Sequence, residues 1–142
     1  MSAQDPSLRK AFVVRPAQGR TYGMGRMRGI FLADGAETGS QYSLYEWWLE
    51  PRTRGPGTHV NPEEHIFCVI AGTLSLCLDG RWTDAPRGSY AVIPGGVPHD
   101  FENRGAEECG FIGINVPGGF EEDLPELVKW FAEHPPGDVA GD

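Results

Sequence analysis

The chain has few cysteines, no long apolar run and no leader-like start. Its three cysteines, an odd number, all lie inside apolar stretches, at Cys68, Cys77 and Cys109. No apolar stretch approaches the roughly 20 residues of a membrane-spanning helix, and the first residues lack the basic-then-apolar pattern of a secretory signal. We therefore expect a cytoplasmic protein with buried, reduced thiols.

The chain also has fewer basic than acidic residues. The chain carries 12 Lys and Arg against 20 Asp and Glu, which gives a formal net charge of −8 at pH 7. Nucleic acids and anionic membranes both bind basic surfaces, so this balance disfavours either of them as a partner. We expect a small molecule as the partner instead.

Glycine and proline, in contrast, are abundant and separate a series of short apolar runs. The chain has 20 Gly and 12 Pro in 142 residues, about twice the usual frequency. Residues 66–70 and 73–78 have the composition of buried strands, and Asp79-Gly80 is a strong hairpin signal. Short strands at regular spacing without intervening helices predict one all-β domain, either a barrel or a sandwich.

The domain limits follow from composition. Residues 1–10 are polar and are expected to form a flexible tail. The first strand is expected near residues 12–14, and one domain is expected to span residues 11–142. The chain shows no internal repeat, which indicates one domain and not two.

A helix is predicted only near the C-terminus. Asp123 is a suitable N-cap, and Pro125 falls in the first turn. Apolar residues spaced three and four apart then continue to Phe131, and Pro135 stops the pattern. We predict one short helix over about residues 123–134, packed on the outside of the barrel.

Residues 88–103, GSYAVIPGGVPHDFEN, carry the most specific pattern in the chain. The fixed positions are Gly88, Pro94, Gly96, His99 and Asn103. They resemble the second signature of the cupin superfamily, G-x5-P-x-G-x2-H-x3-N, at every fixed position. The resemblance implies a single cupin barrel, also called a double-stranded β-helix or jelly roll.

A less regular pattern precedes it, formed by His59, Asn61, His65 and Gly72. It resembles the first cupin signature, in which H-x-H is followed by x3-4-E-x6-G. Asn61 stands where the second His is expected, and His65 stands where the Glu is expected. The function of this chain therefore has to be argued from these two departures.

The resemblance implies His59, His65 and His99 as ligands of one ion, with Asn61 as a weak fourth. His59 and Asn61 are two residues apart, so they share a face if they lie on a strand. Three imidazoles suit a divalent transition metal such as Zn, Fe, Ni or Cu better than Mg or Ca. The alternative is a degenerate cupin that has kept the barrel and lost the ion, for which Asn61 is the main evidence.

The altered donor set changes the expected chemistry. Three imidazoles without a carboxylate give a more positive site, which should bind an anionic or enolate oxygen strongly and lower the pKa of bound water. The site also lacks a carboxylate to act as general base. Glu46 and Glu64 are the candidate catalytic carboxylates; the alternatives are an outward ion pair for Glu46 and a solvated turn for Glu64.

Four residues are candidates for substrate contacts. Arg26 and Arg28 share strand parity and would clamp a carboxylate or phenolate if their strand lines the barrel mouth. The alternative is two solvated arginines on an edge strand. Phe67 and Phe101 are candidates for an apolar wall beside the histidines.

Two classes of function remain open. The first is a metal-dependent enzyme acting on a small anionic, enol or aromatic molecule, by dioxygenase-like chemistry or by Lewis-acid chemistry of the cyclase, isomerase or lyase type. The second is a non-catalytic cupin that holds a metabolite. We also expect a homodimer, formed through the strand near residues 12–14 or through the strand of Trp47 and Trp48.

Overall fold

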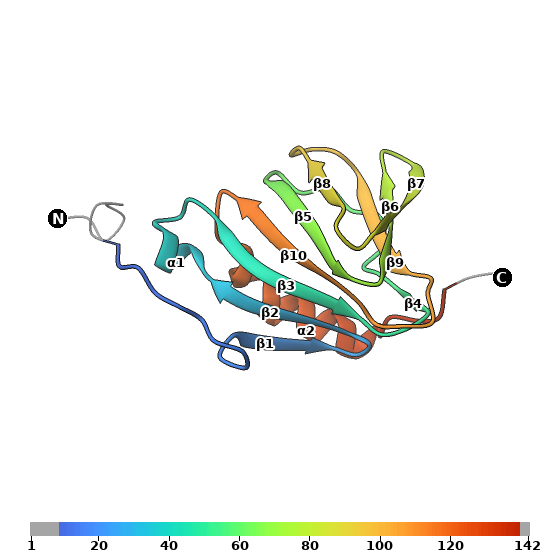
Figure 1. Cartoon of the computed structure of the whole chain (residues 1–142), viewed down its shortest axis with the longest axis horizontal. Coiled ribbons are helices and arrows are strands. Elements are labelled where there is room, and N and C mark those ends of the chain that lie inside the picture. Colours follow the sequence, from blue (N-terminus) through green and yellow to red (C-terminus); the bar gives the residue numbers. More distant parts are fainter. Residues whose placement is uncertain (1–8, 140–142) are drawn as a thin grey trace.

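The computed structural model describes residues 9–139 as two antiparallel sheets that enclose a common core (Figure 1). The strands are β1 (Arg20–Met24), β2 (Met27–Ala33), β3 (Ser43–Leu49), β4 (Thr53–Arg54), β5 (Glu64–Ala71), β6 (Thr73–Leu78), β7 (Arg81–Pro86), β8 (Tyr90–Ile93), β9 (His99–Asn103) and β10 (Cys109–Val116). The larger sheet has the order β1-β2-β3-β10-β5-β8, and the smaller sheet has the order β4-β9-β6-β7. This architecture confirms the predicted all-β jelly roll.

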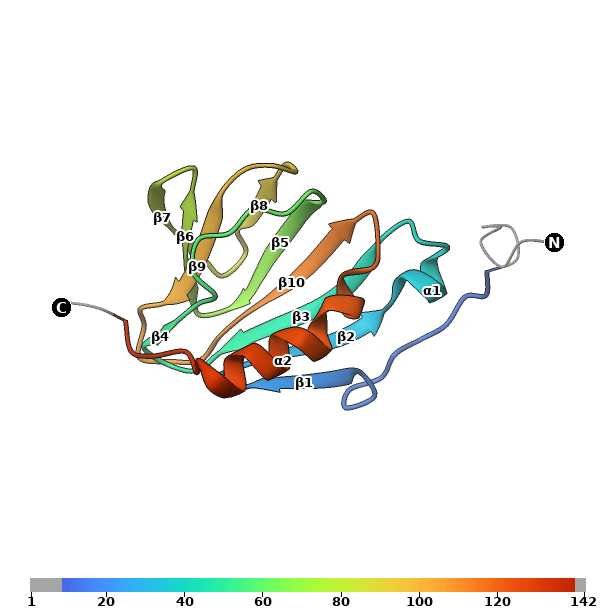
Figure 2. The ribbon, with the colours of Figure 1, turned by 180° about the vertical axis from the view of Figure 1, so that it is seen from behind.

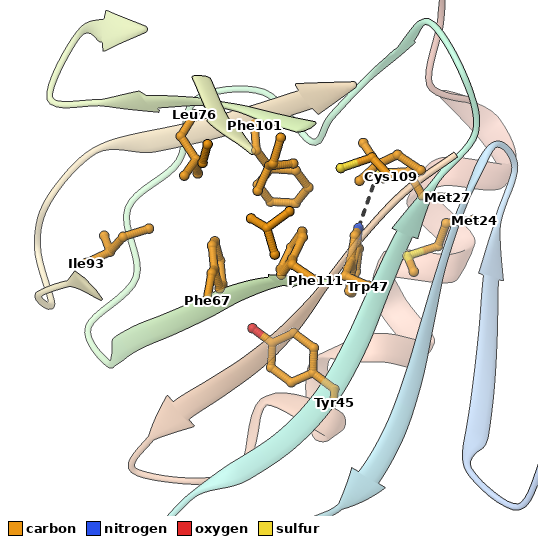
Figure 3. Close-up of a cluster of buried hydrophobic side chains, with 14 of the residues drawn as sticks. Met24, Met27, Tyr45, Trp47, Phe67, Leu76, Ile93, Phe101, Cys109 and Phe111 are labelled. Carbon is orange, nitrogen blue, oxygen red and sulfur yellow. Dashed lines mark hydrogen bonds between the residues drawn. The ribbon is translucent and has the colours of Figure 1, made fainter. Parts of the chain in front are cut away.

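Alternating burial shows which face of the larger sheet meets the core. In β3, Tyr45, Trp47 and Leu49 are buried, whereas Glu46 and Trp48 lie on the opposite face. Because side chains alternate along a strand, one face of β3 contributes to the core and the other does not. The inward side chains of both sheets form a single apolar cluster that is rich in aromatic rings (Figure 3).

The hairpin between β6 and β7 confirms a local prediction. Asp79 and Gly80 both have positive φ, 51° and 86°, as a two-residue turn of type I′ requires. The turn pairs Leu78 with Arg81 and sets the register of the two strands. Asp-Gly was therefore a sufficient signal for this part of the fold.

The C-terminal helix is present, but its expected position is wrong. A 3-10 turn, η2 (Phe120–Asp123), leads into α2 (Leu124–Glu133), whose Leu124 and Phe131 are buried. The helix crosses β1, β2 and β3 (Figure 2) and adds its apolar side chains to the common core instead of packing outside the barrel. It covers the part of the larger sheet that the smaller sheet leaves open.

Side-chain hydrogen bonds fix the start of this C-terminal segment. The Glu121 carboxylate accepts hydrogen bonds from Ser43 Oγ at 2.6 Å and from the Gly35 amide at 3.1 Å. The Gly119 amide in turn donates to Ser43 Oγ at 2.9 Å. The polar end of β3 therefore anchors η2, and through it α2.

Several expectations about the N-terminal third are wrong. Residues 12–14 form no strand, and Phe12 and Val13 are 49 % and 73 % exposed. A short helix, α1 (Gly35–Thr38), was not predicted. Trp47 and Trp48 lie in β3, which is paired on both sides and is no edge strand.

No helix between residues 9 and 139 combines the length and apolar character needed to cross a membrane. The expected tail at residues 1–10 falls mostly outside the described residues.

Candidate metal centre and ligand cavity

Three histidines from different parts of the chain meet between the two sheets. His65 is in β5 of the larger sheet, and His99 begins β9 of the smaller sheet. His59 lies before β5 and forms a bridge with His99, in which each backbone amide donates to the other residue's carbonyl at 3.0 Å. The ring centroids of His59 and His99 are 4.3 Å apart, and those of His65 and His99 are 5.1 Å apart.

Backbone carbonyls orient two of the three rings. The Nδ1 of His59 donates to the Gly57 carbonyl at 2.7 Å, and the Nδ1 of His99 donates to the Val97 carbonyl at 2.9 Å. A carbonyl oxygen can only accept, so Nδ1 carries the proton in each ring. Each ring therefore keeps an unprotonated Nε2, the form that binds a metal ion.

The third ring, His65, is oriented by a side chain. Its Nδ1 lies 2.7 Å from Asn115 Oδ1, and Tyr45 Oη donates to the same oxygen at 2.7 Å. His65 is 3 % exposed, and its buried Nε2 has no hydrogen-bond partner among residues 9–139. A buried imidazole nitrogen without a partner is costly unless a ligand satisfies it.

The strand register explains this arrangement. Asn115 of β10 lies directly opposite His65 of β5. A Cβ at Gly113 would lie 2.3 Å from the Tyr45 ring, so only glycine lets that ring pack over β10. Sheet pairing and one glycine together bring the Tyr45 hydroxyl to Asn115.

Burial keeps two of the histidines neutral. It lowers the pKa of His65, and the hydrogen bond to Asn115 and the charge of Glu63 oppose this effect. Burial also lowers the pKa of His99, whereas the hydrogen bond to the Val97 carbonyl raises it. Metal binding requires neutral imidazoles, so the environment favours the required protonation state at neutral pH.

The donor set fits a transition metal, although the side chains do not form a complete metal cluster as they stand. No group of three or more His, Cys, Asp or Glu residues in the described chain has a ready metal-binding geometry. An imidazole bound through Nε2 has its centroid about 3.2 Å from the ion, so ligands at 90–110° have centroids about 4.5–5.2 Å apart. The two measured separations, 4.3 and 5.1 Å, are close to this range.

Asn61 and Glu63 lie beside the histidines. Asn61 lines the same cavity as His59, and its Nδ2 donates to Glu63 Oε1 at 3.2 Å. The negative charge of Glu63 acts on His65, on His99 and on Tyr45, whose pKa is raised mainly by burial. Of the two carboxylates beside this motif, Glu63 and not Glu64 is therefore the one whose charge acts on the histidines.

The histidines lie at one part of a cavity of about 590 Å³, a volume typical of small-molecule sites. Its walls are mainly aromatic. The aromatic lining residues are Tyr45, Trp47, Phe67, Phe101, Phe111, Phe120, Trp130 and Phe131. The cavity therefore offers an apolar, ring-lined space next to three imidazoles.

Phe67 and Phe101 line this cavity as predicted, but the two candidate carboxylates do not reach it. Glu46 lies on the outer face of β3, where it accepts a hydrogen bond from Trp48 Nε1 at 2.9 Å. Glu64 is exposed and has the opposite strand parity to His65. Both catalytic assignments are therefore corrected by the position of the side chains.

The two candidate arginines are also outside the cavity. A hairpin at Gly25-Arg26 separates β1 from β2, so Arg26 and Arg28 do not belong to one strand. Arg26 binds Asp138 at 2.6 Å near the C-terminal end. Arg28 binds Glu108 at 2.7 Å on the outer face of the sheet. Neither residue is placed to clamp a substrate carboxylate.

Sequence reasoning missed the residues that the C-terminal segment and β10 supply. Leu127, Trp130 and Phe131 line the cavity, because α2 closes its open side. The apolar stripe of α2 was visible in the sequence, but the surface that it covers was not. Asn115 shares strand parity with the buried Phe111, which could have placed it inward; its position opposite His65 depends on the sheet register.

Comparison with known proteins agrees with this architecture. The family model described as "Cupin domain" matches residues 45–115, which contain all three histidines. The chain belongs to the cupin family.

Among curated proteins, the chain is similar to a quercetin 2,3-dioxygenase of Bacillus subtilis, with 32 % identity over 136 residues. The match covers 92 % of this chain and 39 % of the relative, so the chain spans well under half of that protein's length.

Two solved structures show the same fold at low identity. The polyketide cyclase RemF from Streptomyces resistomycificus matches with a TM-score of 0.67 and 20 % identity, over 94 % of this chain and 88 % of that one. A predicted oxalate decarboxylase from Thermotoga maritima matches with a TM-score of 0.67 and 17 % identity, over 75 % and 99 %. These likenesses concern the fold alone.

Proposed function

We propose that this cupin is a metal-dependent enzyme that acts on a small aromatic, enol-bearing molecule in a dioxygenase-like reaction. The observation that carries the proposal is the arrangement of His59, His65 and His99. Oxygen acceptors hold all three Nδ1 atoms, and this leaves each Nε2 free beside an aromatic cavity. The similarity to a quercetin dioxygenase supports the reaction class.

The three histidines would hold one divalent transition metal such as Zn, Fe, Ni or Cu. Bound there, the ion would act as a Lewis acid towards a substrate oxygen and, if redox-active, would support oxidation by O2. The protein's contribution is to keep the imidazoles neutral and to fix their orientation through Gly57, Val97 and Asn115.

The remaining groups would position the substrate and move its proton. The aromatic walls hold a planar molecule and exclude water from the reacting end of the cavity. The negative charge of Glu63 raises the pKa of His65 and of His99, against the effect of burial. Glu63 lies just outside the cavity lining, so we propose it as the acceptor of the enol proton through one bridging water, with Asn61, which lines the cavity, holding its carboxylate in place.

The alternative is Lewis-acid chemistry of the cyclase, isomerase or lyase type. All three proposed ligands are imidazoles, and none is a carboxylate. Such a donor set suits a non-redox ion such as zinc as well as it suits iron. Oxygen consumption separates the two reactions.

The test is an oxygen-uptake assay on protein purified without added metal and then reconstituted separately with Fe, Ni, Cu and Zn. Wild-type protein should consume O2 with an enol-bearing aromatic substrate when a redox-active ion is present. Glu63→Gln should lower kcat at least tenfold, whereas the matched change Glu64→Gln on the outer face should leave it within about twofold.

Substrate turnover with zinc and without O2 uptake would replace the dioxygenase proposal with the cyclase-type alternative. Ligand binding without turnover under any metal would leave a non-catalytic binding protein.

A further inference from the structure

The Asp, Glu, Lys and Arg residues that line the cavity in the described chain are all acidic. Three carboxylates at the start of the C-terminal segment line the cavity, namely Glu122, Asp123 and Glu126, and all three are exposed residues. Neither Lys nor Arg is among the lining residues of the described chain. The arginines expected to bind an anionic group lie elsewhere, so an anion in the cavity would meet no cationic Lys or Arg side chain among the lining residues between residues 9 and 139.

Two further carboxylates lie close enough to Asp123 to affect it. Burial raises the pKa of Asp123, and the negative charges of Glu63 and Glu121 raise it further. Glu63 also acts on His65 and His99. Negative charge therefore extends from η2 towards the histidines, and clefts with apolar walls strengthen the potential of such charges.

The carboxylates belong to a built ligand cavity and are more than a surface cluster. The Nε2 of His65, in a residue that is 3 % exposed, lines the same cavity and has no partner. Trp130 lines the cavity from α2 and is 52 % exposed. One face of this indole is stacked on the His134 ring, with centroids 3.6 Å apart. The other face, beside the carboxylates, offers cation–π attraction to the same positively charged ligand that the carboxylates attract.

We infer that the cavity selects planar aromatic molecules that are neutral or positively charged outside their metal-facing end, and that Asp123 and Glu126 reject the corresponding anions. This inference rests on the proposed function only in taking the cavity as the substrate site. It differs from the expectation of an anionic substrate, because the attraction of the histidine centre for an oxygen anion acts only beside the histidines. The substrate class is then a neutral polycyclic enol or phenol, or an aromatic amine.

Three probes with one ring system test the charge preference directly. They are 2-(aminomethyl)anthracene, which is cationic, 2-(hydroxymethyl)anthracene, which is neutral, and anthracene-2-carboxylate, which is anionic. Binding is measured by anthracene fluorescence anisotropy on chelator-treated protein at low ionic strength, and again after zinc is added. In the chelator-treated protein we expect the amine to bind at least tenfold more tightly than the carboxylate, with the alcohol in between.

Variants separate a local effect from overall charge. Asp123→Asn with Glu126→Gln should reduce the preference for the amine to less than about threefold, and 0.5 M salt should weaken it in the wild type, because salt screens exposed charges. The matched control is Glu107→Gln with Glu133→Gln, which removes the same charge from exposed residues outside the cavity lining and should keep the tenfold preference.

The possible outcomes distinguish this inference from the proposed function. Equal or tighter binding of the carboxylate by the chelator-treated protein, or binding of none of the three probes, would overturn the inference. If the probes follow the predicted order but the protein binds no metal and turns over no substrate, the charge selection stands and the proposed enzymatic function fails.

Discussion

Asn115 is the residue on which the orientation of His65 depends. Its Oδ1 accepts from His65 Nδ1 and from Tyr45 Oη, both at 2.7 Å. Hydrogen-bond partners of metal-binding histidines fix the ring and its tautomer, and their loss typically lowers metal affinity 10–100-fold. The loss of the Asn115 side chain should therefore weaken metal binding at His65.

We expect Asn115→Leu to weaken zinc affinity by about 10–100-fold while the far-ultraviolet circular dichroism stays that of a folded β-protein. Competition titration with a chromophoric chelator measures the affinity. Tyr45→Phe is the matched control, since it removes the other donor to Asn115 and should change zinc affinity less than threefold. An unchanged affinity in Asn115→Leu would show that this amide does not position His65.

Cys109 provides a prediction for alkaline pH. Burial raises the pKa of its thiol from 9.0 to about 12, and the charge of Glu108 adds to the effect. In the unfolded chain the thiol loses its proton near pH 9, whereas in the folded chain it keeps the proton until about pH 12. Deprotonation therefore favours the unfolded state in this window, and stability falls as the pH rises through it.

Between pH 8 and pH 10 this thiol should remove about 1.4 kcal/mol from the free energy of unfolding. Urea titrations at the two pH values measure the loss, and Cys109→Ala should show a loss smaller by that amount. Equal losses in wild type and variant would mean that the folded protein does not hold this thiol protonated.

The residues of the site differ in how far sequence could place them. His59, His65 and His99 occupy positions that the two motifs mark, and the structure brings the His65 and His59 rings to His99. Glu63 and Glu64 could not be separated, because both lie at the start of β5 and only the fold shows whose charge acts on the histidines.

At the level of elements, two loops are held together next to the histidines. The Gly96 amide donates to the Asn61 carbonyl at 2.9 Å, and a Cβ at Gly95 would lie 2.1 Å from the Pro62 carbonyl oxygen. The loop between β8 and β9 therefore supports the segment that carries His59. Only glycine at position 95 permits this approach.

Gly95→Ala should lower the free energy of unfolding by about 1–3 kcal/mol, because the added methyl group forces the two loops apart. It should also weaken zinc binding, since the displaced loop carries His59. Gly23→Ala is the control: a Cβ there meets nothing within 4 Å, and its stability should change by less than about 0.5 kcal/mol. If Gly95→Ala is as stable as the control, the loop contact is not tight.

The bounds of the helix α2 could be predicted from the sequence, but the surface on which it packs could not. The N-cap position, the proline and the apolar stripe predicted its bounds to within one residue at each end. They could not show whether the stripe would meet the outer or the inner face of a sheet. That choice depends on the smaller sheet leaving β1, β2 and β3 uncovered, which is a property of the whole fold.

At the scale of the whole molecule, the expected homodimer stays a prediction, and its contact strand changes. The edges of the larger sheet are β1 and β8. In β8, Tyr90 and Val92 are 75 % and 60 % exposed, on the same face as the adjacent Cys68 and Ile66 of β5. An exposed edge strand with apolar side chains invites pairing with another strand, so we propose that a second copy of the chain pairs there.

Sedimentation velocity at micromolar concentration should detect this dimer. Val92→Lys should shift the protein towards monomer, whereas Thr83→Lys, on exposed β7 of the other sheet, should not. A wild-type monomer at that concentration would contradict the proposal.

The proposed enzyme requires His59, His65 and His99 to hold one metal ion together. The most direct measurement is the metal content of the folded protein by inductively coupled plasma mass spectrometry. The protein is first incubated with one transition metal, and the unbound ion is then removed. Wild type should retain about one ion per chain, and His65→Ala should retain less than a tenth of that while it keeps the circular dichroism of the folded barrel. His134→Ala, at the exposed end of α2, should bind like the wild type. Full occupancy in His65→Ala, or no retained ion in wild type with any of Zn, Fe, Ni or Cu, would contradict the three-histidine centre.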